Sequence, residues 1–294
     1  MDFIKAKTIL SKVDGSDWYG IDYNMNLYRG CPHGCIYCDS RSECYHIDNF
    51  DVPRGKENAL YILERELSSK KTHGVVGIGS MSDTYNPQEI IYEQTRGALK
   101  LLSKYNFGVS IDTKSDLILR DLDLLKEINS KNNVIIKFTI TTPYDELSKK
   151  IEPNVCVSSK RFSAIKTLSD NGIFAGIMMN PVLPFITDSE EDIKKLVKMA
   201  YDNGAKFIHT YMGMTLRDIQ RDYYFDKLDC KFPGLKDKYI NYYKNSYNCA
   251  VPNYKGLYKV FTDECDKYGI LYNMSDIIKA YKKNINSLEQ LSLF

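Results

Sequence analysis

Three cysteines lie close together near the start of the chain, in a pattern that suits a metal cluster. Cys31, Cys35 and Cys38 are separated by three and by two residues. Cysteine thiolates are the usual protein ligands of a 4Fe-4S cluster, and three of them on a short loop can hold three irons while the fourth stays open. An open iron can bind a second molecule and change it. The spacing therefore predicts an iron-sulfur site that does chemistry.

Other kinds of site could use the same cysteines. A structural zinc site normally needs four protein ligands, and His33 and His46 are available nearby in the sequence. A disulfide with a spare thiol, or three unrelated core cysteines, are further alternatives. Proline, histidine and glycine inside the loop suit a tight wrap around a cluster, which favours the iron-sulfur interpretation.

Composition sets limits on location and partners. Eight cysteines in a chain of 294 residues fit a reducing compartment, where thiols stay free. The sequence has no apolar run long enough to cross a membrane, and residues 1–5 lack the layout of a signal peptide. We therefore expect a cytoplasmic protein with no membrane attachment. A net charge of +2 and a pI near 8.0 neither support nor exclude a nucleic-acid partner.

Strand and helix patterns alternate along most of the chain, which is typical of consecutive βα units around a parallel sheet. The strand candidates are residues 22–28, 75–80, 108–113, 134–142, 173–181 and 206–212. Six right-handed units curl into a partial (β/α)6 TIM-type barrel, with the chemistry at the C-terminal ends of the strands. The cysteine loop follows the first strand, as this fold requires. Thr187 and Glu190 predict a capping box at the start of the helix after the fifth strand.

We expect three parts in the chain. Residues 1–215 form the barrel with an N-terminal lead-in, residues 216–285 a helical extension rich in tyrosine and lysine, and residues 286–294 a tail. Aromatic and basic residues in the extension could stack on exposed bases and neutralise phosphates. The plainer alternative, which the pattern favours, is a set of amphipathic helices packed on an open barrel edge.

Short segments of the chain resemble radical S-adenosylmethionine (SAM) enzymes, in which an aromatic residue such as Tyr37 precedes the last cysteine of the loop. Residues 26–31, 113–115, 141–142 and 152–153 are similar to the spore photoproduct lyase-like branch, often described as DNA repair photolyases. The resemblance covers roughly residues 20–225. It implies that the three cysteines hold a 4Fe-4S cluster, that SAM chelates the fourth iron, and that the enzyme is lyase-like and cleaves SAM to a 5'-deoxyadenosyl radical.

The resemblance, together with the polar residues at the strand ends, predicts which side chains bind SAM. Residues 79–87 occupy the place where the superfamily binds the amine of SAM, with Ser80, Ser82 and Asp83 as candidates. An ordinary Asx or Ser turn ahead of a helix would explain this segment equally well. Tyr37 is a further candidate because of its place in the loop.

The remaining SAM candidates follow later strands. Lys114 ends the third strand and could bind a carboxylate, unless it is a plain surface lysine. Lys137 and Thr139 share the inward face of the fourth strand. Arg161 could bind the SAM carboxylate or, as an alternative, form a structural pair with Glu152. The last of these candidates is Asn180 on the fifth strand.

The hydrogen donor is less clear from the sequence. In spore photoproduct lyase the radical takes hydrogen from a cross-linked thymine dimer, and a cysteine between the cluster loop and the third strand returns one. This chain has no cysteine between Cys44 and Cys156, so dimer reversal by that route is in doubt. Cys156 and Cys44 are the candidate donors. We expect Cys230, Cys249 and Cys265 to be ordinary buried thiols.

The last five residues, Gln290 to Phe294, match the Gln-Leu-Ser-Leu-Phe peptide by which bacterial DNA repair and replication proteins bind the β sliding clamp. Apolar anchors on a free C-terminus can enter a preformed pocket. The alternative is a frayed helix end that packs back on the domain.

These observations leave three functional hypotheses. The first is a radical SAM enzyme that acts on DNA, by lesion reversal or base modification, with recruitment by the sliding clamp and with flavodoxin or ferredoxin as reductant. The second is a radical SAM enzyme that acts on a peptide, RNA or small molecule. The third is a non-enzymatic iron-sulfur DNA-binding adaptor.

Overall fold

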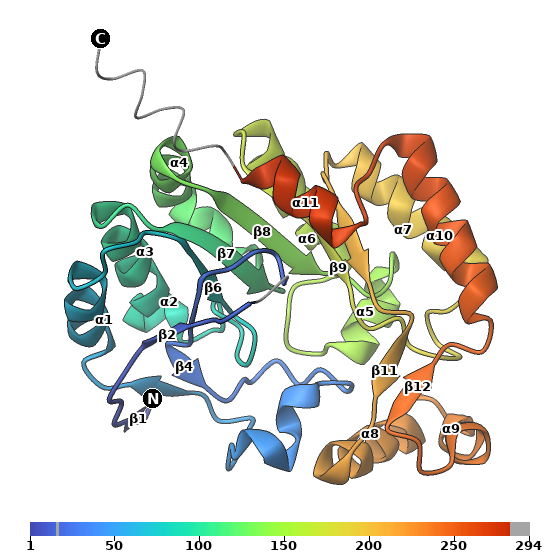
Figure 1. The fold of residues 1–294 in the computed structure, drawn as a ribbon. Coiled ribbons are helices and arrows are strands. Elements are labelled where there is room, and N and C mark those ends of the chain that lie inside the picture. The colour runs from blue at the N-terminus through green and yellow to red at the C-terminus, as the bar shows by residue number, and fades with distance from the viewer. Residues whose placement is uncertain (16–17, 283–294) are drawn as a thin grey trace.

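A mostly parallel sheet forms the centre of the computed structural model, which describes residues 1–15 and 18–282 (Figure 1). Along the sheet the strands follow the order β10-β9-β8-β7-β6-β3-β2, and all neighbours from β10 to β3 are parallel. Their bounds are β2 Leu10–Lys12, β3 Tyr23–Met25, β6 Val75–Ile78, β7 Gly108–Thr113, β8 Val134–Thr139, β9 Phe174–Met179 and β10 Ile208–Thr210. The predicted partial (β/α)6 barrel is thereby confirmed.

The N-terminal part of the chain adds a second, smaller sheet. The predicted strand 22–28 is shorter than expected, because the chain leaves the barrel after Met25 and pairs elsewhere. Here β4 (Tyr28–Arg29) pairs with β5 (Arg54–Lys56), which also pairs with β1 (Phe3–Ile4). This small sheet fixes the chain on both sides of the cysteine loop.

Helices cover the outer face of the barrel with apolar stripes. The bounds are α1 Ala59–Ser68, α2 Glu89–Tyr92, α3 Gln94–Lys104, α4 Leu122–Lys131, α5 Asp145–Ile151, α6 Ser158–Asp170 and α7 Glu190–Asp202, with short 3-10 turns η1 Asp39–Arg41, η2 Glu43–Tyr45 and η3 Asp116–Asp121. On α7, Ile193, Leu196 and Val197 are buried against the sheet. Burying each such side chain contributes roughly 1.5–3 kcal/mol, so this packing is a main source of stability.

The predicted capping box of α7 is wrong in its residues. Ser189 is the N-cap, and its hydroxyl accepts a hydrogen bond of 3.0 Å from the backbone of Asp192. Thr187 instead accepts from the backbone of Leu183 at 2.8 Å and closes the preceding turn. Glu190 is the first residue of the helix, because Ser189 offers a hydroxyl one position before it.

The segment after the barrel is largely helical. It contains α8 Asp218–Lys231, α9 Leu235–Tyr243, α10 Tyr254–Tyr268 and α11 Met274–Tyr281, together with β12 (Asn248–Ala250), which pairs antiparallel with β11 (Gly213–Thr215). Tyr224 and Tyr239 are fully buried, whereas Tyr242, Tyr247 and Tyr254 are about half exposed. The tyrosines therefore serve both the core and the surface. The tail Gln290 to Phe294 lies outside the described residues.

Both edges of the open barrel are covered. On one side, Glu66 of α1 accepts hydrogen bonds from the backbone of Ile9 and Leu10 at 3.0 and 2.8 Å, beside β2. On the other side, Leu271 exchanges backbone hydrogen bonds with Ile208 and Lys206 beside β10, at 2.9 and 3.1 Å. No helix among residues 1–15 and 18–282 has the length and apolar character needed to span a bilayer.

Replacing Tyr239 by Phe should destabilise the protein by about 1–3 kcal/mol. The Tyr239 hydroxyl donates to the Pro184 carbonyl at 2.7 Å and accepts from the Tyr224 hydroxyl at 2.9 Å, so its removal leaves two buried groups without a partner. Urea unfolding measures the loss. Tyr242→Phe, at an exposed ring on the same helix, should leave the free energy of unfolding unchanged. Equal values for the two variants would contradict the expectation.

Candidate active site

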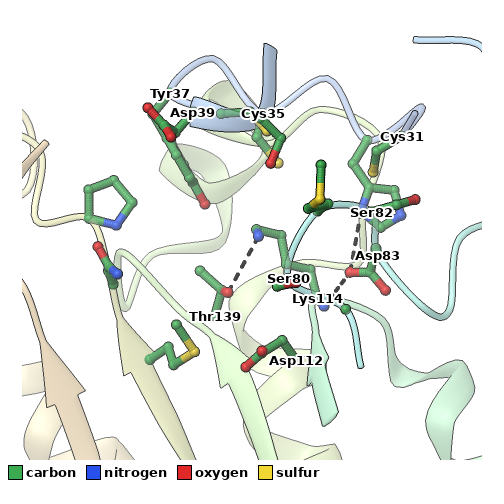
Figure 2. Close-up of a pocket in the computed structure, with 18 of the residues that line it drawn as sticks. Cys31, Cys35, Tyr37, Asp39, Ser80, Ser82, Asp83, Asp112, Lys114 and Thr139 are labelled. Atoms are coloured by element: carbon green, nitrogen blue, oxygen red, sulfur yellow. Dashed lines mark hydrogen bonds and ion pairs between the residues drawn. The ribbon is translucent and has the colours of Figure 1, made fainter. Parts of the chain in front are cut away.

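A cavity of about 420 Å³ lies at the C-terminal ends of the barrel strands, under the cysteine loop (Figure 2). Residues from the loop, from the ends of β6 to β9 and from the β11–β12 region surround it. The lining residues are Trp18, Cys31, His33, Cys35, Tyr37, Cys38, Asp39, Ser40, Gly79, Ser80, Met81, Ser82, Asp83, Asp112, Thr113, Lys114, Thr139, Met178, Asn180, Pro181, Tyr211, Met214, Thr215 and Tyr247. All three cysteines of the loop thus face one space.

The start of the cysteine loop is fixed by backbone contacts. Gly30 has φ +83°, and a side chain there would place Cβ 2.7 Å from the Phe50 carbonyl oxygen. The next residue, Cys31, donates its N–H to that same carbonyl at 2.7 Å. The hydroxyl of Ser82 donates to the Gly30 carbonyl at 2.6 Å. Only glycine combines this conformation with this close approach.

The segment between α5 and α6 holds the rest of the loop. Ile36 donates its N–H to the Ile151 carbonyl at 3.0 Å, and Asn154 donates its N–H to the His33 carbonyl at 3.2 Å. The Asn154 side chain also donates to the Pro32 carbonyl at 2.8 Å. The loop has no regular secondary structure of its own, so these bonds determine where its thiols lie.

The thiols are shielded from water. Cys31 and Cys35 are buried, and burial raises the pKa of Cys31 to about 12. Burial also raises the pKa of Cys35 and Cys38, while the ammonium of Lys114 opposes that rise. Because metal ligands must be thiolates, a cation at this place assists metal binding. The donor set therefore fits an iron-sulfur cluster on three cysteines.

The zinc alternative finds no support in the described residues. No three histidine, cysteine, aspartate or glutamate side chains among them are grouped closely enough to hold a single metal ion. His46 is exposed and does not line the cavity. His33 lines the cavity, and its Nδ1 lies 3.5 Å from Asp83 Oδ2. Burial lowers the pKa of His33, although Asp83 opposes this effect.

Of the candidates after β6, Ser82 and Asp83 already have structural roles. Asp83 accepts hydrogen bonds from the backbone of Tyr85 at 2.9 Å and Lys114 at 2.7 Å, and from the Thr113 hydroxyl at 2.8 Å. The Asx-turn alternative is thus correct for this residue, although both side chains still line the cavity. Ser80 also lines it and is exposed to solvent.

Lys114 and Thr139 face the cavity together. The Lys114 ammonium donates to the Thr139 hydroxyl at 3.3 Å, and the ring of Tyr37 lies 5.9 Å away (Figure 2). Lys114 is half-buried and is not the plain surface lysine that the sequence left open. Asn180 lines the same cavity from the end of β9. These four side chains are therefore brought together as the sequence led us to expect.

Lys137 lies behind the cavity wall, not in it. Its ammonium is 3.0 Å from Asp112 Oδ1, donates to Ser110 at 2.9 Å and sits 4.2 Å from the centre of the Tyr19 ring. Asp112 does line the cavity, on the side opposite the cysteines (Figure 2). Burial raises the pKa of Asp112, and Lys137 opposes that rise. Lys137 can act on a ligand only through Asp112.

Arg161 is also placed behind the wall. It is fully buried and pairs with Glu152 at 2.6 Å, as the structural alternative predicted. Its other donors reach the carbonyls of Cys156 at 2.8 Å and Thr139 at 2.9 Å. The Tyr37 hydroxyl donates to the second oxygen of Glu152. Arg161 supports the cluster loop and does not line the cavity.

Neither proposed hydrogen donor lines the cavity. The Cys156 thiol donates to the Lys114 carbonyl at 3.1 Å and faces a separate cavity of about 610 Å³. Cys44 is exposed on η2. Apart from Cys31, Cys35 and Cys38, no cysteine is among the residues that line the main cavity in the described part of the chain.

Sequence reasoning missed Asp39 and Trp18 at the cavity mouth and considered Tyr247 only as one of the aromatic residues of the extension. Asp39 binds the Thr215 hydroxyl at 2.9 Å and the Arg217 guanidinium at 2.6 Å, which joins the cysteine loop to β11 and α8. Trp18 and Tyr247 line the mouth with partly exposed rings. The position of Asp39 directly after Cys38 was an available signal, whereas its partners are 176 and 178 positions away.

Comparisons with known proteins agree with this geometry. A sequence model of the radical SAM superfamily matches residues 25–200. An uncharacterized protein of Methanocaldococcus jannaschii, MJ0683, is 35% identical over 175 residues, which span 58% of this chain and 64% of that relative. The uncharacterized protein Rv2578c of Mycobacterium tuberculosis is 28% identical over 248 residues, or 82% of this chain and 73% of that relative.

Solved structures give the same picture of the fold. A spore photoproduct lyase complexed with dinucleoside spore photoproduct has a TM-score of 0.66 at 13% identity, with 90% of this chain and 79% of that chain covered. A mutant of the same lyase with bound AdoMet and dinucleoside spore photoproduct has a TM-score of 0.65 at 12% identity, with 90% and 78% covered. At this identity the likeness concerns the fold alone.

Lys137→Met should destabilise the protein by about 3–5 kcal/mol at pH 7, because it leaves the Asp112 carboxylate buried without its cation. The folded-state pKa of Asp112 then rises further above its unfolded value, so the destabilisation is largest at high pH and shrinks as the pH falls. Urea unfolding at pH 5 and pH 8 measures this slope.

Lys104→Met is the matched control for this prediction. Lys104 pairs with Glu64 at 2.6 Å on the surface, where solvent screens the two charges, so its loss should change the free energy of unfolding little at either pH. The double variant Asp112→Asn/Lys137→Met should recover part of the loss, since it buries no unpaired charge. A loss that is the same at both pH values would show that the pair does not act through its charge.

Proposed function

The chain belongs to the radical SAM superfamily, whose members use a 4Fe-4S cluster and SAM, and we propose that Cys31, Cys35 and Cys38 hold this cluster. The three thiols face one cavity, and the cation of Lys114 favours the thiolate form of Cys35 and Cys38. When bound, the cluster and SAM supply a 5'-deoxyadenosyl radical that abstracts hydrogen from a substrate. The chain is thus a radical SAM enzyme, and its own residues position and shield the reactants.

Each cavity side chain has a role in this proposal. Lys114 pairs with a carboxylate, which a point charge at the end of β7 can do without a fixed geometry. Ser80 accepts from an amine, and Thr139 and Asn180 bind hydroxyl or amide groups of the nucleoside. The ring of Tyr37 covers the ligand on the side of the loop.

We propose DNA as the substrate, acted on by lesion reversal or base modification. The observation that carries this proposal is the aromatic mouth of the cavity, formed by Trp18, Tyr211 and Tyr247. The Arg217 guanidinium lies 5.5 Å from the Tyr247 ring beside it. Exposed rings next to a cation suit the stacking of a base that has left the duplex. The shared fold with a lyase that was solved with a dinucleoside photoproduct adds support.

The absence of a further thiol from the described cavity wall favours a reaction other than cysteine-dependent dimer reversal. Base modification needs no such donor at this place. The modest net charge of +2 keeps a peptide, RNA or small-molecule substrate as the second candidate. In either case we expect a cytoplasmic enzyme reduced by a flavodoxin or ferredoxin.

The decisive experiment measures 5'-deoxyadenosine. The protein is loaded with iron and sulfide under anaerobic conditions, and SAM and dithionite are added with or without ultraviolet-treated DNA. A rise of at least tenfold with DNA is expected. SAM cleavage at the same rate with and without DNA would support a peptide, RNA or small-molecule substrate. A protein that is loaded with the cluster but never cleaves SAM would favour the iron-sulfur adaptor.

Variants at the mouth sharpen this experiment. Tyr247→Ala should weaken DNA binding about 5- to 100-fold, since stacking on one ring is worth about 1–3 kcal/mol. Tyr201→Ala is the matched control, because its ring is similarly exposed but stacks on Tyr268, and neither of these residues lines the cavity. Fluorescence anisotropy with labelled single strands measures both. Equal losses would place DNA elsewhere on the protein.

The tail gives a separate prediction. We propose that Gln290 to Phe294 recruits the enzyme to the β sliding clamp. Deleting these five residues should abolish binding to immobilised clamp and leave SAM cleavage unchanged. Replacing Leu291 and Phe294 by Ala should have the same effect, because apolar anchors carry such peptides. Full clamp binding by the deleted chain would refute the proposal.

A further inference from the structure

A buried ion pair stands directly behind the cysteine loop. Glu152 and Arg161 are 1% and 0% exposed, and both belong to the connection between α5 and α6 or to the first turn of α6. A buried pair is seldom more stabilising than apolar residues of the same size, since both ions lose their hydration. The cost of burying this pair therefore points to a role other than stability.

The contacts of the pair connect three parts of the site. One Glu152 oxygen accepts from the hydroxyl of Tyr37, directly before Cys38, and the other pairs with Arg161. Arg161 binds the carbonyl of Thr139 at the end of β8 and that of Cys156 before α6. Its Nη2 has no hydrogen-bond partner among the described residues. The carboxylate is thus held in one position, next to the loop.

Charges of both signs surround the loop. Lys114, Arg161 and Arg41 are cations near it, Asp83 and Glu152 are carboxylates near it, and Asp39 and Asp112 also line the cavity. In a site shielded from water, removing one of these charges changes the electrostatic potential at the thiols far more than it would at the surface. Glu152 is the carboxylate that also contacts the loop through the Tyr37 side chain.

We propose that Glu152 offsets the charge of the buried Arg161 behind the cluster, so that the reduction potential of the cluster stays low, and that Glu152 also fixes the orientation of Tyr37. This inference rests on the proposed cluster at Cys31, Cys35 and Cys38. Charge and hydrogen bonding around an iron-sulfur centre are the means by which a protein sets its potential. A negative charge behind the loop disfavours the added electron, which makes the reduced cluster a stronger reductant toward the molecule it binds. Glu152 acts through its charge and through the side chain of Tyr37, so it is a positioning residue.

The test is a redox titration of the reconstituted protein, followed by the electron paramagnetic resonance signal of the reduced cluster. Glu152→Gln keeps the shape and an oxygen that accepts from Tyr37, but removes the charge. At a fixed ambient potential its ratio of reduced to oxidised cluster should rise about tenfold. Glu152→Asp keeps the charge and should restore the ratio to within about threefold of the original. An unchanged ratio in Glu152→Gln would overturn the inference.

Two further variants separate charge from structure. Tyr37→Phe removes the hydroxyl but no charge, so it should alter the shape of the signal with SAM bound and leave the ratio unchanged. Glu146→Gln, at an exposed residue on α5, should change neither. If Glu152→Gln fails to fold because Arg161 is left unpaired, the double variant Glu152→Gln/Arg161→Met buries no net charge, and its ratio should match that of the original protein. A tenfold rise in the double variant would contradict the inference.

Failure of the inference and failure of the proposed function remain distinguishable. An original protein that binds no iron and sulfide under reconstitution would refute the cluster itself. If the original protein binds the cluster and cleaves SAM, and the cluster of the Glu152→Gln variant has the same reduction potential, only the role of Glu152 is refuted.

Discussion

The hydrogen bonds that fix the cysteine loop decide where every other group of the site can lie. The loop belongs to no helix or strand, so segments distant in sequence must position its thiols. Phe50 binds its start, Ser82 binds Gly30, and residues 151–154 bind its middle. Each of these partners belongs to a different connection of the barrel. The cavity therefore takes its shape only when the whole barrel has folded.

Polar groups near the loop divide into two kinds. Some already have all their partners within the protein. Asp83 accepts hydrogen bonds from two backbone N–H groups and a hydroxyl. Glu89 accepts from the backbone of Thr95 and pairs with Arg120 at 2.9 Å. Others, such as Lys114 and Asn180, face the cavity. The first kind holds the second in place, which is how a mostly apolar barrel can present a few oriented polar groups to a ligand.

The sequence allowed prediction of what depends on local pattern. Apolar, β-rich runs that alternate with helical patterns located the six parallel strands, and the cysteine spacing with Tyr37 identified the family. Whether Arg161 binds a ligand or pairs with Glu152, and whether Lys137 lies in the cavity or behind Asp112, depend on which side of a strand end the chain turns. Local pattern does not contain that information. The link from Asp39 to Arg217 was missed for the same reason, since long-range contacts of single polar residues leave no periodic signal.

The covered edges of the barrel have a consequence for aggregation. A parallel sheet that does not close into a full barrel ends in two strands whose outer N–H and C=O groups can pair with another chain. Glu66 occupies such groups beside β2, and Leu271 occupies those beside β10. The connection between α10 and α11 therefore protects the chain from edge-to-edge association. A chain shortened to the barrel alone would expose the outer edge of β10, where the strand of another chain could then pair.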